Sequence, residues 1–177
     1  VFNAGENVLI DCASPQRAAL VQKLSLYRLR AKLMIEMDND LEVGVHMNKP
    51  DEGLRYPDPR YAGMGWRSFQ STGSLINVPD GHGYDERRIA LGLADSTLDL
   101  GVEKTFPHEA NFDQFGGVDF KKGCYIGQEV VSRMQHRGTA RSRMLPIAFD
   151  AKPDDMKVMA GDTLIGEIHS CSEKNGL

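Results

Sequence analysis

Along the first thirty positions, the spacing of the apolar residues changes from that of a strand to that of a helix. Residues 8–10 form a short apolar run, which predicts a buried strand. Ser14 followed by Pro15 predicts a helix start, because the serine hydroxyl can accept a free amide proton and proline is tolerated in the first turn. One face of that helix would carry Leu20, Leu24 and Tyr27.

The next segment alternates between apolar and polar residues, which is the period of a half-buried strand. Leu33, Ile35 and Met37 follow this pattern, and residues 41–47 follow it again after the turn residues 38–40. The sequence therefore predicts a hairpin of these two strands after the helix.

Proline and glycine interrupt residues 48–83, where we expect loops around one strand at residues 66–69. A short helix is predicted over residues 84–91, with Asp85 and Glu86 in its first turn and Gly92 after its end. Residues 105–119 are typical of a loop.

A third helix is predicted over residues 127–136, because Val130, Val131 and Met134 form an apolar stripe and Gly138 follows as a stop. Beyond it, residues 144–149 and 163–168 read as two strands of a separate β unit. The pattern as a whole indicates an α+β fold.

Composition and charge narrow the class of protein. The 177 residues are 41% hydrophobic and 26% charged with a net charge of -4, and the mean hydropathy is -0.39. These values are typical of a globular protein of one domain or of one domain and part of another, and we expect no membrane segment. Three cysteines without paired spacing indicate a reducing compartment and no zinc site. No signal peptide is visible at the start of the sequence.

Cys124 is the first candidate for chemistry. It follows Lys122 and precedes a predicted helix start, and both a cation and a helix N-terminus favour a thiolate. The glycines at 123 and 127 would let the backbone approach a ligand. The alternative is that Cys124 is a small buried apolar residue, as free cysteines often are.

Basic residues are concentrated around this cysteine. Six lie between residues 121 and 143 against the single acid Glu129, a patch that could bind a polyglutamate tail, a phosphate or RNA, or could be a solvated face. Only one aromatic residue lies within this patch, so direct RNA binding is not favoured.

Residues 107–113 place polar groups in a loop, but His108 and Glu109 alone fall short of a metal motif. Arg67 could clamp a carboxylate of a ligand or form an ion pair within the protein.

Four segments together resemble a known family. The string KKGCYIGQEVVSRMQHRG at residues 121–138 resembles the signature of the YgfZ-type folate-binding proteins, in the iron-sulfur cluster assembly and repair branch of the glycine-cleavage T-protein (aminomethyltransferase) superfamily. Supporting matches are DPRYAGMGWR at 58–67, YDERRIALG at 84–92 and FPHEANFDQFGGVDF at 106–120.

The resemblance implies a T-protein-like folate-binding domain with ferredoxin-like βαβ halves over residues 1–143, followed by the start of a C-terminal β-barrel over 144–177. We expect the first domain to lack its N-terminal part and the barrel to be incomplete. The resemblance also implies that the protein is a tetrahydrofolate-binding factor that supports iron-sulfur cluster assembly or maintenance, with an indirect effect on tRNA modification. Its partners would be folate and iron-sulfur client or assembly proteins, in the bacterial cytoplasm or the mitochondrial matrix.

The resemblance also implies roles for single residues. Cys124 corresponds to the functional cysteine of the motif and Lys122 to its lysine neighbour. The expected lining of the folate cavity is Arg67, Glu109, Tyr125, Gln128 and Arg133. Relatives often carry an acid where this chain has Ala90, so the partner of the pterin ring is either absent or supplied by another acid such as Glu109.

The resemblance leaves one alternative function open. The protein could be an aminomethyltransferase that transfers a one-carbon unit to tetrahydrofolate. That chemistry needs a carboxylate within hydrogen-bond reach of the folate nitrogen.

Overall fold

The computed structural model describes residues 1–74, 82–101, 104–125, 127–138, 140 and 142–177. The chain divides into two compact units. The first contains residues 1–59 and 65–79, and the second contains residues 60–64 and 80–177.

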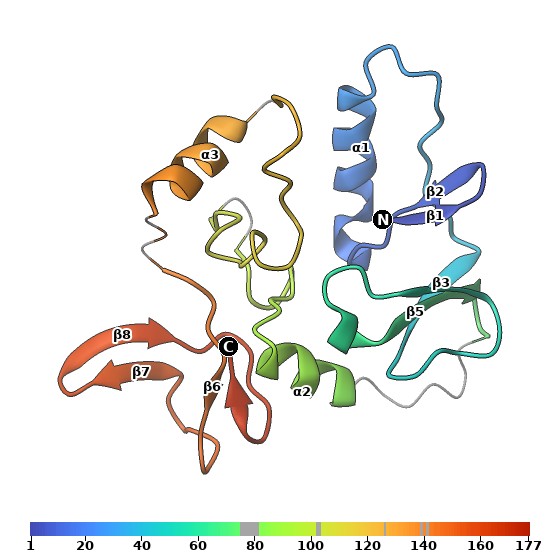
Figure 1. The fold of residues 1–177 in the computed structure, drawn as a ribbon. Coiled ribbons are helices and arrows are strands. Elements are labelled where there is room, and N and C mark those ends of the chain that lie inside the picture. Colours follow the sequence, from blue (N-terminus) through green and yellow to red (C-terminus); the bar gives the residue numbers. More distant parts are fainter. Residues whose placement is uncertain (75–81, 102–103, 126, 139, 141) are drawn as a thin grey trace. The chain divides into compact units, whose positions relative to one another are not determined.

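The first unit is built around a three-stranded antiparallel sheet with the strand order β3-β5-β4 (Figure 1). Its strands are β3 (Leu41–His46), β4 (Leu54–Pro57) and β5 (Trp66–Ser71). A hairpin of β1 (Phe2–Ala4) and β2 (Asn7–Leu9) precedes them, followed by the 3-10 turn η1 (Ser14–Gln16) and the helix α1 (Arg17–Tyr27).

Three aromatic rings form the core of this unit. The ring of Phe2 lies 5.3 Å from that of Tyr56 and 5.0 Å from that of Phe69, measured between centroids, and the last two rings are 6.1 Å apart. Tilted and edge-on contacts of this kind add to the free energy of burying the rings. They fasten the N-terminal hairpin to the sheet.

Gly65 allows the chain to enter β5. Its φ is +78°, and a Cβ atom here would overlap the carbonyl oxygen of His46 in the neighbouring strand. A residue other than glycine would therefore meet both a left-handed backbone and a backbone clash.

The predicted hairpin of residues 32–37 with 41–47 is wrong. β3 forms as expected, but residues 32–37 belong to no strand, and β3 pairs instead with β5, with Leu41 opposite Ser71 and His46 opposite Trp66. β4, which contains Pro57 and which the sequence did not reveal, completes the sheet on the other side of β5.

Two other expectations for the first unit need correction. The strand at 8–10 forms as β2, but it is not buried, since Val8 is 62% exposed. The helix after Ser14 is confirmed, yet the Ser14 side chain makes no cap hydrogen bond and α1 buries none of its residues.

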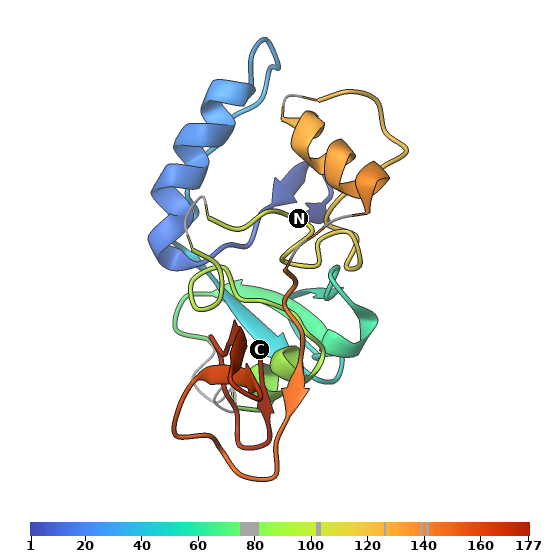
Figure 2. The same ribbon diagram turned by 90° about the vertical axis from the view of Figure 1, so that its left-hand side faces the viewer.

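The second unit contains the other two predicted helices and four short strands. The helices are α2 (His82–Ala90) and α3 (Gln128–Arg137), with the 3-10 turn η2 (Ala62–Met64). The strands are β6 (Ile147–Ala148), β7 (Lys157–Ala160), β8 (Thr163–Glu167) and β9 (Asn175–Gly176), paired as β6-β9 and β7-β8. Figure 2 shows α3 in orange and, in yellow, the irregular segment that leads into it.

A buried arginine organises the second unit. Arg88 is 1% exposed, and its guanidinium binds Asp85 and Asp99, each at 2.6 Å, and the hydroxyl of Ser170 at 2.8 Å. Burial alone would lower the pKa of Arg88, but its hydrogen bonds and its attraction to the two aspartates more than offset burial and raise that pKa. α2, the turn at residues 95–99 and the C-terminal segment are thus joined through one charged side chain.

The β unit at the C-terminal end consists of two two-stranded sheets, and among the residues described here they do not close into a barrel. The T-protein-like fold and the domain boundary after residue 143 stay predictions. None of the helices in the described part of the chain is both long and apolar enough to cross a membrane.

Candidate functional site

The cysteine motif lies on an exposed turn directly before α3. Cys124 is exposed, four residues ahead of Gln128, where the helix begins. Gly127 occupies the helix N-cap with a φ of +87°, a conformation that favours glycine. The side chain of Gln128 reaches back to accept a hydrogen bond from the backbone N–H of Tyr125 at 3.1 Å. Gln128 therefore stabilises the turn that presents the thiol.

Lys122 and Tyr125 flank the thiol and contact each other. The ammonium nitrogen of Lys122 lies 4.3 Å from the centroid of the Tyr125 ring, within the range of a cation-π contact. Lys122 is exposed, and a Cβ atom built at Gly123 would meet nothing within 4 Å. The structure thus brings together four of the residues singled out in the sequence: Lys122, Cys124, Tyr125 and Gln128.

Arg133 is on α3 and is exposed. The apolar stripe expected on this helix is only partly buried, since Val131 is 8% exposed and Val130 is 45% exposed. Gly138 ends the helix in a left-handed conformation and donates its N–H to the carbonyl of Met134, as the glycine signal predicted.

Glu109 and its loop are held by internal hydrogen bonds. One carboxylate oxygen of Glu109 accepts the backbone N–H of Phe106 at 2.9 Å, and the other accepts the hydroxyl of Ser142 at 2.9 Å. In this arrangement the carboxylate supports the loop.

Arg143, part of the basic stretch, clamps the same loop. Its guanidinium makes two hydrogen bonds to the carboxylate of Asp113, at 3.0 and 2.8 Å, and a third to the carbonyl oxygen of His108 at 3.0 Å. The hydrogen bond from Arg143 holds the pKa of Asp113 below its usual range, and Asp113 raises the pKa of Arg143. Arg143, one of the six basic side chains of this stretch, is therefore engaged in an ion pair within the protein.

His108 connects the loop to α3 in a way the sequence did not reveal. It is 2% exposed, and its Nε2 lies 3.2 Å from the side-chain oxygen of Gln135. Because an amide oxygen can only accept, this hydrogen bond needs the tautomer that has its proton on Nε2. The other ring nitrogen, Nδ1, is buried without a hydrogen-bond partner among the described residues.

Arg67 belongs to the first unit, where it forms an ion pair with Asp11 and another with Asp58, the latter at 3.1 Å. Of the two readings open to this arginine, the structure therefore shows the ion pair within the protein. The expected contact with folate stays a prediction.

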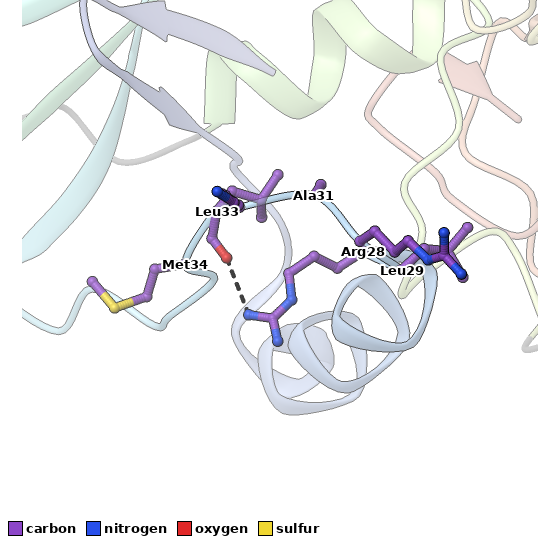
Figure 3. A pocket seen from close by; sticks show the side chains of 7 residues that line it. Arg28, Leu29, Ala31, Leu33 and Met34 are labelled. Carbon is purple, nitrogen blue, oxygen red and sulfur yellow. Dashed lines mark hydrogen bonds between the residues drawn. The ribbon is translucent and has the colours of Figure 1, made fainter.

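A shallow concavity of about 520 Å³ lies in the first unit, where α1 leads into the following loop (Figure 3). Its lining is the run of residues 28–34, none of which was expected to bind folate. Among the described residues, no group of three or more His, Cys, Asp or Glu side chains has the geometry to hold a metal ion.

Comparison with known proteins finds relatives with one common name. The chain is 32% identical over 160 residues to the human mitochondrial iron-sulfur cluster assembly factor IBA57, covering 80% of this chain and 45% of that protein. It is 32% identical over 157 residues to the IBA57 homologue of Mycosarcoma maydis, covering 80% of this chain and 38% of that protein. It is 30% identical over 188 residues to the homologue of Chaetomium globosum, covering 93% of this chain and 43% of that protein.

The chain spans less than half the length of these curated relatives. No family model matches it. The sequence is thus similar to mitochondrial iron-sulfur cluster assembly factors, which supports the iron-sulfur branch of the resemblance and leaves its folate-binding side open.

Proposed function

We propose that this chain is part of a tetrahydrofolate-binding factor for iron-sulfur cluster assembly, with Cys124 as its reactive or sulfur-handling group. The similarity of this chain to proteins named iron-sulfur cluster assembly factors supports a role in iron-sulfur cluster assembly. The observation that carries the proposal is the exposed thiol on the turn before α3, flanked by Lys122 and Tyr125. An accessible thiol can bind iron or take part in sulfur transfer, whereas a buried one is inert.

The side chains around Cys124 fit part of a folate. The exposed ammonium of Lys122 suits a glutamate carboxylate, and the ring of Tyr125 suits stacking against an aromatic ring. Arg133, exposed on the following helix α3, offers a further cation. Bound tetrahydrofolate would supply a one-carbon or redox-active carrier beside the thiol.

Two residues expected to line the folate cavity have other partners in this structure. The carboxylate oxygens of Glu109 accept hydrogen bonds from its own loop, and Arg67 is paired with aspartates. The proposal therefore rests on Lys122, Tyr125 and Arg133.

The aminomethyltransferase alternative ranks second for the same reason. It requires a carboxylate free to exchange a proton with folate, and both oxygens of Glu109 already accept hydrogen bonds. Direct RNA binding ranks third, because Arg143 is bound to Asp113. An effect on tRNA modification would follow indirectly, through iron-sulfur enzymes.

The location proposed for a eukaryotic source is the mitochondrial matrix, in line with the relatives named as mitochondrial. For a bacterial source it is the cytoplasm. The proposed partners besides folate are iron-sulfur client or assembly proteins.

Titration calorimetry with tetrahydrofolate tests the binding step on the full-length protein that contains this chain. Lys122→Ala should weaken binding about tenfold, because it removes a charge-assisted contact to a carboxylate. Lys157→Ala in β7 is the matched control and should leave affinity unchanged. Absence of heat with the unmodified chain, or equal effects of both variants, would contradict the folate site.

The thiol is tested separately in cells depleted of their own assembly factor. Cys124→Ser should retain folate binding but fail to restore the activity of an iron-sulfur enzyme, while Cys171→Ser should restore it. Full rescue by Cys124→Ser would remove the cysteine from the proposal.

A further inference from the structure

The helix α1 is followed by a leucine in a conformation that leucine seldom adopts. Arg28, directly after the last helical residue, is in the right-handed helical region, and Leu29 has a φ of +51° in the left-handed region. That region is unfavourable for leucine because its Cβ crowds the following carbonyl oxygen. Leu29 is 84% exposed, so packing of its side chain does not account for the strain.

The end of α2 shows what usually stabilises such a conformation. Gly92 is left-handed there, with a φ of +74°, and its N–H donates to the carbonyl of Ile89 at 3.0 Å. The N–H of Leu93 donates to the carbonyl of Arg88 at 2.8 Å. These two hydrogen bonds satisfy carbonyl groups that the last turn of the helix leaves open.

At the end of α1 the corresponding donors have no acceptor among the residues that the structure describes. These donors are the backbone N–H groups of Leu29 and Arg30. A right-handed residue followed by a left-handed one directs successive N–H groups into one concavity, an arrangement called a nest, which binds anions. Residues 28–30 have this arrangement, and their N–H groups are not used by the helix.

Positively charged side chains surround the nest. Arg28, Arg30 and Lys32 line the concavity of about 520 Å³ at the end of α1, and the sequence has no acidic residue between Asp11 and Glu36. Within the described structure, the side chains of Arg30 and Lys32 form no hydrogen bond and no ion pair. The C-terminal end of a helix carries only about half a negative charge, so three cations leave this concavity strongly positive.

The loop around the nest is held in shape by its own hydrogen bonds. The guanidinium of Arg28 donates to the carbonyl of Leu33 at 3.0 Å (Figure 3). The N–H of Ala31 donates to the carbonyl of Arg28 at 3.0 Å, and the N–H of Leu33 donates to the carbonyl of Ala31 at 3.0 Å. A loop that is ordered before its ligand arrives loses less conformational entropy on binding.

We propose that residues 28–32 bind the phosphate group of a phosphomonoester. Such a group carries a charge of about −1.5 to −2 at neutral pH and three strong acceptor oxygens. It therefore matches three cations and a nest of N–H groups better than a carboxylate does, and arginine has the planar fork that suits phosphate.

The phosphate group could belong to a soluble compound or to the headgroup of a lipid. Leu29 and Met34, which are 84% and 79% exposed beside the cations, would enter the apolar boundary of a membrane in the second case. Both sources present the same group to the nest, and they are separated by experiment.

Equilibrium dialysis with inorganic phosphate tests the site on the full-length protein that contains this chain. We expect a Kd of about 1 mM. The double variant Arg30→Gln/Lys32→Gln should raise this Kd at least about tenfold, because it removes two of the three cations. Lys152→Gln/Lys157→Gln in the second unit is the matched control, since it removes the same charge from exposed positions and should leave the Kd unchanged.

Substitutions at Leu29 test the nest itself. Leu29→Gly keeps the left-handed conformation accessible and should change the Kd by no more than about twofold. Leu29→Pro removes the N–H and fixes φ near −65°, so it should raise the Kd about tenfold. Circular dichroism checks that each variant is folded. If the proline variant does not fold, Leu29→Val replaces it, because a branched side chain disfavours a positive φ, and it should also raise the Kd.

Vesicle flotation identifies the source of the phosphate group. Binding to phosphatidylcholine vesicles that contain phosphatidic acid, but not to phosphatidylcholine alone, would identify a lipid headgroup. Leu29→Gly should then weaken vesicle binding without weakening phosphate binding, since it removes an apolar side chain and keeps the nest. Binding of inorganic phosphate without vesicle binding would identify a soluble compound, and either result supports the site.

Three results would overturn the proposal. One is the absence of phosphate binding up to roughly 10 mM. Another is an equal effect of the two double variants, which would mean that net charge alone attracts the anion. The third is an unchanged Kd for the folded proline or valine variant of Leu29, which would show that the nest takes no part.

Discussion

Replacing Arg88 by methionine would leave a buried carboxylate without its cation. The Asp99 side chain is 0% exposed, and Arg88 is its only cationic partner in the described structure, at 2.6 Å. An arginine side chain carries a positive charge in proteins, and its aspartate partners raise the pKa of Arg88 further, so the substitution removes a full positive charge. Asp99 would keep only its hydrogen bonds from the Ser170 hydroxyl and the backbone N–H of Asp95.

The expected cost follows from this geometry. Breaking a buried ion pair by removing one partner typically lowers the free energy of unfolding by about 3–5 kcal/mol. Whole domains are stable by only about 5–15 kcal/mol, so Arg88→Met should consume a large part of the stability of the second unit. Asp99→Asn in the same chain should recover part of this loss, because the amide carries no charge and its oxygen can still accept a hydrogen bond.

Urea unfolding followed by circular dichroism, with hydrogen exchange of the α2 amides, measures these effects. Arg87→Met is the matched control, since Arg87 is the exposed neighbour on the same helix and should cost at most about 1 kcal/mol. If Arg88→Met cost no more than Arg87→Met, the buried network around Arg88 would not stabilise the second unit.

Three further substitutions or measurements test the rest of the structure. Gly65→Ala should destabilise the chain by at least about 2 kcal/mol in thermal unfolding, whereas Gly73→Ala, with a φ of +86° and open space around it, should cost only about 1 kcal/mol. The folded-state pKa of Asp113 lies below its unfolded value, so its contribution to stability is present above about pH 4 and is lost as the pH falls through the folded pKa. The difference in stability between the unmodified chain and Asp113→Asn should therefore shrink below about pH 4, and Arg143→Lys should reduce it at neutral pH by removing the bidentate geometry. In alkylation followed by mass spectrometry, Cys124 should react before the other two cysteines, which are only partly exposed, and a faster reaction at either of them would contradict the exposed turn.

Much of what the sequence predicted correctly came from local signals, the residues at the ends of the helices. The helices expected after Ser14, over 84–91 and over 127–136 all form, because proline, glycine and charged residues at helix ends act within a few positions of one another. The position of Cys124 just before a helix start was predicted correctly for the same reason.

The prediction from sequence failed where residues far apart in the chain pair with each other. β3 joins β5 rather than the adjacent alternating segment, since the choice of strand partner depends on packing that no local pattern contains. Glu109 and Arg143 were read as part of a loop cluster and a basic patch, yet each is bound to a residue about thirty positions away.

The sequence by itself determined the helices, the two glycines that bracket α3 and the motif around Cys124, because these depend on the conformational preferences of neighbouring residues. Only the tertiary structure decided which charges form internal ion pairs, which strands are partners and that residues 32–37 form no strand. These features depend on which groups lose contact with water together, and that is set by the whole packed chain.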